Sequence, residues 1–154
     1  MCIVLPGQPL WLPELNSLAG FKITEKKNGV HVARKDFSYP IQALRIDPEA
    51  IWGDHDHCLH FALDRDAAED NLLGDYGSHL LFCALPPGHF WSREMGDERC
   101  LHGDMTVPLA CLTCGEGQLE PEIIDATWQP VPSSNGRSPS DPFSWLRQLP
   151  VVAS

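Results

Sequence analysis

Two stretches of this chain concentrate side chains that bind transition metals. In the first, a histidine cluster, His55, His57 and His60 stand in a run that also holds aspartates and a cysteine. A strand would project His55 and His57 from one face, about 7 Å apart, which lets two imidazoles share one ion. The sequence favours a solvated polar turn here, and the alternative is a metal site in a small metalloprotein.

The spacing His55-x-His57-x-x-His60 resembles part of the metallo-β-lactamase signature, although Leu59 stands in the place of its aspartate. The same pair of histidines, followed later by Pro-Pro-Gly-His89, is similar to a pattern of the cupins, the double-stranded β-helix family. The glycine and glutamate spacings of the first cupin motif are absent. These partial resemblances imply a hydrolase or a cupin-like small-molecule site with its metal at the histidine cluster, and the chain as a whole is not recognised as a member of a family.

The second stretch is a cysteine cluster, in which Cys100-x-His102 precedes Cys111-x-x-Cys114 and a glycine. Three sulfurs and one imidazole are the ligand set of a closed structural zinc site, and zinc is the cofactor that this stretch predicts. The site requires a turn after Cys111, because a continuous strand would send Cys111 and Cys114 to opposite faces. Buried free cysteines are the interpretation that the sequence favours over this zinc site.

Two further cysteines, Cys58 and Cys83, are candidate nucleophiles. Cys58 lies beside His57 and His60, but adjacency in sequence does not position an imidazole to form a thiolate. Cys83 lies in an apolar run and is expected to be buried and inert. The chain also lacks Gly-x-Ser-x-Gly, P-loop and Rossmann glycine patterns. The sequence therefore favours a protein that is not an enzyme.

The clearest element that could position such residues is a β-hairpin at Asn28-Gly29 between residues 21–27 and 30–35. Asn-Gly supplies the two positive φ angles of a type I′ turn. We expect an inward apolar face and an exposed polar face, which is either a lysine-rich soluble edge or a small anion-facing patch. With Lys27 opposite Val30, the apolar face carries Phe21, Ile23, Val30 and Val32, and the polar face carries Lys22, Thr24, Lys26, His31 and Lys35.

The other elements predict an α+β, β-rich single domain, mainly antiparallel sheet with two or three short helices and a C-terminal arm. The core should form around residues 78–85, an uncharged run without proline or glycine. Further strands are expected at residues 39–46, 105–113 and 122–129, and short helices at residues 13–19, stopped by Gly20, and 66–74, opened by a capping box at Asp66 and Glu69.

Composition divides the chain into a globular domain at residues 1–129, a Pro/Ser-rich linker at 130–142 and an apolar arm at 143–154. Aromatic and leucine anchors on a tethered segment suit docking into a hydrophobic groove of a partner. They equally suit docking onto this domain's own sheet, and a homodimer that exchanges its arms would satisfy both. The anchors are Phe143, Trp145, Leu146 and Leu149.

Charge limits the classes of partner. The 154 residues carry a formal charge of −10 with a pI near 4.9, which opposes direct binding to nucleic acid or to an anionic membrane. No uncharged run approaches the roughly 20 residues that span a bilayer, and the apolar start lacks the basic region of a signal peptide. We therefore expect a cytoplasmic protein whose cysteines are thiols or metal ligands.

Taken together, the sequence favours a non-catalytic acidic binding or regulatory protein that acts by protein–protein interaction and neutralises a basic partner. A small metalloprotein with its metal at the histidine cluster is the alternative. A structural zinc at the cysteine cluster inside an interaction module would combine the two interpretations.

Overall fold

The computed structural model shows a β-rich fold with antiparallel sheets and few helices, which confirms that part of the predicted fold class. The described residues contain one α-helix and one 3-10 turn, so two or three helices are not confirmed. The linker and the anchors Phe143, Trp145, Leu146 and Leu149 lie outside the described residues, and the predicted arm is not confirmed. The described residues are 10–33, 37–54, 56–63, 65–71, 73–74, 77–95, 98–117, 124–125 and 151–152.

Strands dominate the order of elements along the chain. They are β1 (Leu10–Leu12), the 3-10 turn η1 (Pro13–Leu15), β2 (Ser17–Lys27), β3 (Val30–Val32), β4 (Leu44–Ile46), β5 (Leu59–Phe61), α1 (Arg65–Asn71), β6 (His79–Leu85), β7 (Phe90–Met95), β8 (Glu98–Gly103), β9 (Met105–Cys111), β10 (Glu116–Gly117), β11 (Ile124–Asp125) and β12 (Val151–Val152).

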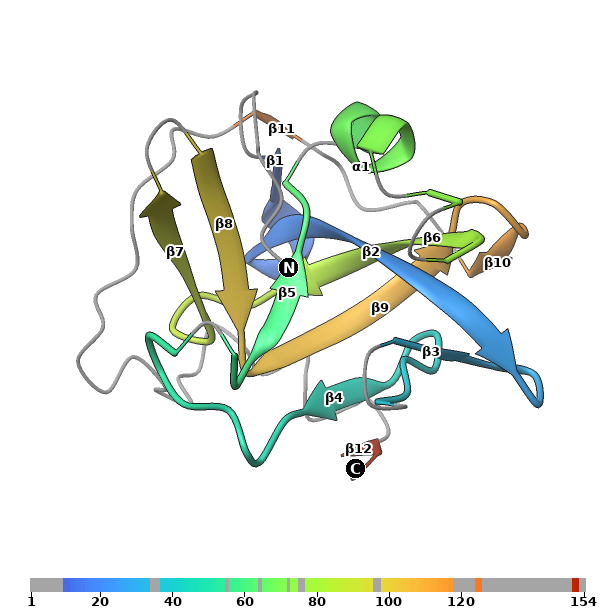
Figure 1. Ribbon diagram of the computed structural model, residues 1–154, viewed down its shortest axis with the longest axis horizontal. Helices are drawn as coiled ribbons and strands as arrows, with labels where there is room; N and C mark the ends of the chain where they lie inside the picture. The colour runs from blue at the N-terminus through green and yellow to red at the C-terminus, as the bar shows by residue number, and fades with distance from the viewer. Residues whose placement is uncertain are drawn as a thin grey trace.

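The strands of the described residues form two sheets (Figure 1). The large sheet has the order β11-β1-β2-β6-β9-β4-β12, with β3 paired to β2 and β10 paired to β9. The small sheet has the order β5-β8-β7. Neighbouring strands are antiparallel except β4 and β12, which run parallel.

The central strand β6 is buried on both faces, which explains its uninterrupted apolar sequence. One face packs with Ala68 of α1, and the other packs against apolar side chains of the small sheet, among them Phe61 and Leu101. The expected core around residues 78–85 is therefore confirmed. Leu80, Phe82 and Ala84 belong to the first cluster, and Leu81, Cys83 and Leu85 belong to the second.

The two sheets are joined where β8 passes into β9 through Asp104 (Figure 1). The Asp104 backbone N–H donates to the His89 carbonyl at 3.0 Å, and His89 Nδ1 lies 3.1 Å from Asp104 Oδ1. Both side chains are buried. This pair fixes the corner at which the chain leaves the small sheet and enters the large one.

The hairpin has the predicted register, because Lys27 pairs with Val30 and the turn residues Asn28 and Gly29 have φ angles of 53° and 79°. The expectation of an exposed polar face is wrong at Thr24 and His31, which are 0% and 2% exposed, and the expectation of an inward apolar face is wrong at Val30, which is 37% exposed. Glu116 of β10 lies against the imidazole and, together with the neighbouring turn, converts this part of the face into an interior site.

The helix predicted at residues 13–19 is wrong beyond Leu15, because Asn16 adopts a left-handed φ of 45° and β2 begins at Ser17. Gly20 is not a helix stop. It lies within β2, where an added Cβ would lie 2.7 Å from Leu85 Cδ1, so glycine permits close packing there.

The structure gives different bounds for the other predicted helix and strands. The helix expected at residues 66–74 is α1, which begins at Arg65, so Asp66 lies in its first turn. The strand expected at residues 39–46 is reduced to β4, because Gln42 turns the chain with a φ of 60°. The strand expected at residues 122–129 is described only at β11.

Candidate metal centres

The histidines of the predicted cluster have different environments. His57 is exposed and its Nδ1 lies 3.0 Å from Asp54 Oδ2, whereas His60 is buried in β5. His55 lies outside the described residues. Among the described residues, His57 and His60 do not belong to one group of donors that could hold a metal ion.

The residues predicted to bind zinc are divided between two groups of donors. Cys111 and Cys114 lie with His31 and Glu116, whereas His102 lies with Cys58 and His60. Cys100 lies in β8, and its side chain is outside the part of the chain that the structure describes. The donor atoms of each group lie within 4.8 Å of one another.

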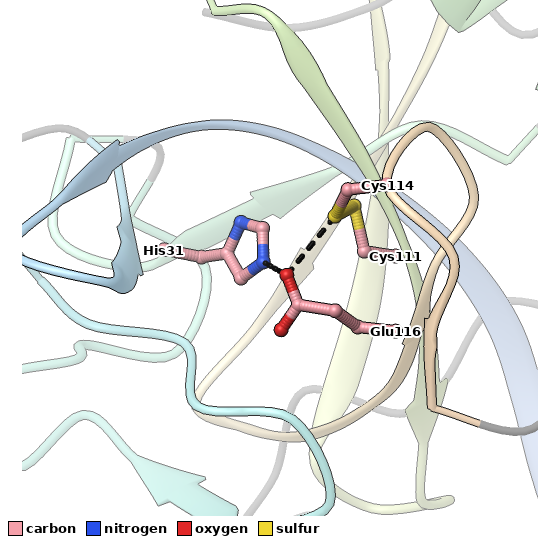
Figure 2. A group of neighbouring side chains, drawn as sticks. All are labelled: His31, Cys111, Cys114 and Glu116. Carbon is pink, nitrogen blue, oxygen red and sulfur yellow. Dashed lines mark hydrogen bonds and ion pairs between the residues drawn. A yellow bond between two sulfur atoms is a disulfide. The ribbon is translucent and has the colours of Figure 1, made fainter.

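We call His31, Cys111, Cys114 and Glu116 the knuckle site (Figure 2). Strand β9 ends at Cys111, and the Gly115 N–H donates to the Cys111 carbonyl at 3.0 Å, which closes the turn. Gly115 has a φ of 72°, a left-handed conformation that glycine adopts without steric cost. The turn that the zinc prediction required is present, and it directs both sulfurs to one side, where they form a disulfide.

The His31 imidazole reaches this turn from β3, a distant part of the sequence (Figure 2). Its Nδ1 lies 3.1 Å from the Thr24 hydroxyl, and its Nε2 lies 3.3 Å from Glu116 Oε1. The Cys114 sulfur lies 3.1 Å from the same carboxylate oxygen. Sulfur, imidazole nitrogen and carboxylate oxygen therefore converge on one small region.

Burial and charge favour the protonation states that a metal ion needs. Burial lowers the pKa of His31, an effect that the hydrogen bond to Glu116 partly opposes, so the imidazole is neutral near pH 7. The hydrogen bond from Lys26, at 2.6 Å, holds the pKa of Glu116 below its usual value, and His31 adds to this effect. A neutral imidazole and an ionised carboxylate both offer lone pairs.

Thr113 links the knuckle turn to the central sheet. Its hydroxyl accepts a hydrogen bond from the Leu80 backbone N–H at 3.1 Å and lies 3.4 Å from the Cys111 sulfur. The same hydroxyl lies 3.4 Å from Nδ1 of His79, whose ring packs edge-on to His31. These contacts hold the Cys111 side of the turn in place.

We call Cys58, His60 and His102 the strand site. His60 of β5 pairs directly with His102 of β8, and their ring centres are 4.8 Å apart. Cys58 lies in a bend directly before β5, two residues ahead of His60. The pairing of β5 with β8 brings His102 next to these two donors, from which it is distant in sequence.

Aromatic rings and one cation border the strand site. The Trp91 ring lies edge-on to His102 with centres 5.9 Å apart, and it also packs on Trp52. Lys22 Nζ donates to the His60 carbonyl at 2.8 Å. Burial raises the pKa of Cys58 to about 12, although Lys22 opposes this shift, so without a metal the group is a thiol and not an activated nucleophile.

Sequence reasoning missed His31 and Glu116 as candidate donors. Glu116 stands two residues after Cys114, and this spacing within Cys-x-x-Cys-Gly-Glu is a local signal that could have identified it. His31 could be recognised only from its place on the hairpin face that also carries Thr24. Nothing in the sequence links that face to the cysteine turn.

Comparison with other proteins found no matching family model, no matching curated protein and no matching solved structure. Within the described residues, no helix is both long and apolar enough to cross a membrane.

Proposed function

We propose that this protein is an acidic binding module whose fold is fastened by one Zn²⁺ ion at the knuckle site. The observation that carries the proposal is the convergence of His31, Cys111, Cys114 and Glu116, whose donor atoms lie within 4.8 Å of one another. Such an ion would connect the hairpin to the turn after β9, which are far apart in sequence.

The chemistry of these donors fits zinc. Zn²⁺ accepts thiolate, imidazole and carboxylate ligands in tetrahedral geometry, where neighbouring donor atoms lie about 3.3–3.8 Å apart. Once the disulfide is open, side-chain rotations within this group of donors would bring them to that spacing. The Thr24 hydroxyl on His31 Nδ1 leaves Nε2 directed at the site, which is how ligating histidines are usually oriented.

The disulfide must open before the sulfurs can bind the ion. A thiol reductant supplies two electrons and two protons, so that the Cys111–Cys114 bond becomes two thiols and the reductant becomes a disulfide. Zinc then displaces the two protons to solvent. The backbone need not move far, because a Cys-x-x-Cys turn already suits either a disulfide or a metal.

Protection of the two cysteines tests the proposal. Protein reduced with a phosphine is treated with iodoacetamide, with and without one equivalent of Zn²⁺, and each cysteine is mapped by mass spectrometry. We expect zinc to slow alkylation of Cys111 and Cys114 by at least about tenfold. Equal alkylation with and without zinc would overturn the proposed site.

A matched pair of glutamates provides the control. Glu116→Gln should weaken zinc binding by about tenfold or more, because the amide replaces a charged ligand. Glu25→Gln makes the same change at an exposed glutamate that accepts a hydrogen bond from Ser78 and is outside the donor group. Similar losses in both variants would show that zinc responds to overall charge and not to the knuckle site.

The binding role is supported by the formal charge of −10. An excess of acidic groups steers association with a basic surface and weakens as salt screens it. The zinc-loaded protein should bind a fluorescent lysine-rich peptide at low salt and release it at high salt, whereas a glutamate-rich peptide should not bind. Failure to distinguish the two peptides would contradict this role while leaving the zinc site intact.

A further inference from the structure

The strand site differs from the knuckle site in how its donors are held. His60 and His102 face each other across paired strands, and they are 8% and 0% exposed. Directly opposed side chains on one face of an antiparallel pair have Cβ atoms about 4.5–5.5 Å apart. The register of the ladder therefore fixes both imidazoles, and no loop has to close around them.

Two indole rings lie in this part of the molecule. The indole N–H groups of Trp52 and Trp91 are buried and have no hydrogen-bond partner within the part of the chain that the structure describes. Buried donors normally find an acceptor, and Trp91 packs against His102.

We infer that Cys58, His60 and His102 form a second metal site, which binds Cu⁺. The proposal is independent of zinc at the knuckle site, because the two groups share no donor. On binding, the Cys58 thiol releases one proton to solvent and its sulfur bonds to the ion, while each histidine contributes one neutral ring nitrogen. No electron transfer is involved.

Ligand type and charge distinguish Cu⁺ from Zn²⁺ at this place. A thiolate together with imidazoles suits soft and borderline metal ions, and these classes include both Cu⁺ and Zn²⁺. With one thiolate, Cu⁺ gives a neutral site, whereas Zn²⁺ leaves one positive charge in a largely buried position next to the Lys22 ammonium. An uncompensated charge is costly in a low-dielectric interior, so the monovalent ion is favoured.

The experiment uses the full chain with Cys111→Ser and Cys114→Ser, so that the knuckle site cannot contribute thiolates. Cu⁺ is added without oxygen in the presence of ascorbate and the chelator bicinchoninate, whose colour reports the copper that the protein does not hold. We expect one equivalent to be retained and tryptophan fluorescence to fall. Co²⁺, used as a spectroscopic substitute for Zn²⁺, should bind more weakly.

Cys58 and Cys83, neither of which is in a disulfide, form the matched control. Cys58→Ala should weaken Cu⁺ binding by more than about tenfold, whereas Cys83→Ala removes a thiol from the core and should leave binding within about threefold. His60→Gln should behave like Cys58→Ala. Circular dichroism of each metal-free variant identifies any loss that arises from unfolding.

Three results would overturn the proposal. The first is equal copper binding by the folded Cys58→Ala and Cys83→Ala variants. The second is a larger loss in His57→Gln than in Cys58→Ala, because this would place the ion at the exposed His57 instead of the strand site. The third is tighter binding of Co²⁺ than of Cu⁺, which would exclude the assigned ion.

Discussion

The knuckle site and the strand site use similar donors but are built by different means. At the knuckle site a turn with left-handed glycines presents the sulfurs, and a histidine comes from a hairpin that is distant in sequence. At the strand site two histidines are held by the hydrogen-bond ladder of β5 and β8. The knuckle carboxylate Glu116 is 38% exposed, whereas His102 is fully buried.

This difference predicts how each site responds to change. A site built on a turn depends on a few backbone angles and on contacts between distant segments, so single substitutions in the turn should disturb it. A site built on paired strands is supported by the whole ladder and by the core beneath it. Its two histidines should therefore be less accessible to reagents and less sensitive to changes in loops.

Thiol reactivity should show the largest contrast. In the reduced, metal-free protein at pH 8, the exposed sulfur of Cys114 should react with iodoacetamide as an ordinary thiol. Cys58 and Cys83 should react on the order of a thousandfold more slowly, because burial raises the pKa of each to about 12 and leaves little thiolate. Mass spectrometry of the labelled peptides measures each rate.

The same shifts determine how stability varies at alkaline pH. The unfolded chain loses the protons of Cys58 and Cys83 above about pH 8.5, while the folded chain retains them. The unfolded state then binds fewer protons, so the free energy of unfolding should fall as the pH rises above that value. Rapid labelling of Cys58 in the folded protein would contradict the assigned burial of the strand site.

The next largest effect should come from β10, the short strand that follows the turn. In Gly117→Ala the new Cβ would lie 2.2 Å from the Leu109 carbonyl oxygen, at a φ of +81°. We expect a loss of about 3 kcal/mol in the free energy of unfolding in urea, together with weaker zinc binding next to Glu116. Copper binding at the strand site should persist in the fraction that remains folded.

Gly29→Ala is the matched control, because Gly29 has a φ of +79° but no atom within 4 Å of an added Cβ. This variant should lose only about 1 kcal/mol, the cost of the left-handed conformation alone. Equal destabilisation by the two variants would show that close packing of β10 against β9 contributes nothing.

A smaller effect should follow when the histidine of the knuckle site loses its orienting hydrogen bond. Thr24→Val removes the hydroxyl at 3.1 Å from His31 Nδ1 and keeps a similar shape. Zinc affinity should fall by about tenfold, and isothermal titration measures it. Thr106→Val removes another buried hydroxyl, which donates to the Ala84 carbonyl, and should lower stability without a specific effect on zinc.

Local structure could largely be predicted from the sequence where it depends on neighbouring residues. Asn28-Gly29 set the hairpin register, and the uniform apolar run of β6 indicated a strand buried on both faces. The Cys-x-x-Cys-Gly pattern indicated a turn with two converging sulfurs. In each case the deciding interactions lie within a few residues, so their signals are present in a short stretch of sequence.

The composition of each metal site could not be predicted, because it depends on strand pairing between distant segments. His31 and Glu116 are separated by 85 positions, and the partner of His60 is determined by the register of the short strand β5 on β8. Spacing along the chain therefore groups Cys111 and Cys114 with His102, which is nearer to them in sequence than His31 is. Strand order, and not spacing along the chain, brings the donors together.

The smallest effect concerns the ion pair at the exposed edge of the knuckle site. Lys26 Nζ lies 2.6 Å from Glu116 Oε1, and both side chains are more than one third exposed. Lys26→Gln should change the free energy of unfolding by less than about 1 kcal/mol, because solvent screens such pairs. The pKa of Glu116 should rise towards its usual value, since the Lys26 hydrogen bond is the main cause of its depression.

Zinc affinity should nevertheless increase by about twofold to fivefold in Lys26→Gln, because a neighbouring cation that repels the ion and occupies the ligand oxygen is removed. Lys27→Gln makes the same charge change on the other face of the hairpin and should leave zinc affinity nearly unchanged. Neither variant should alter copper binding at the strand site. An equal gain in both variants would show that the effect arises from net charge and not from the contact between Lys26 and Glu116.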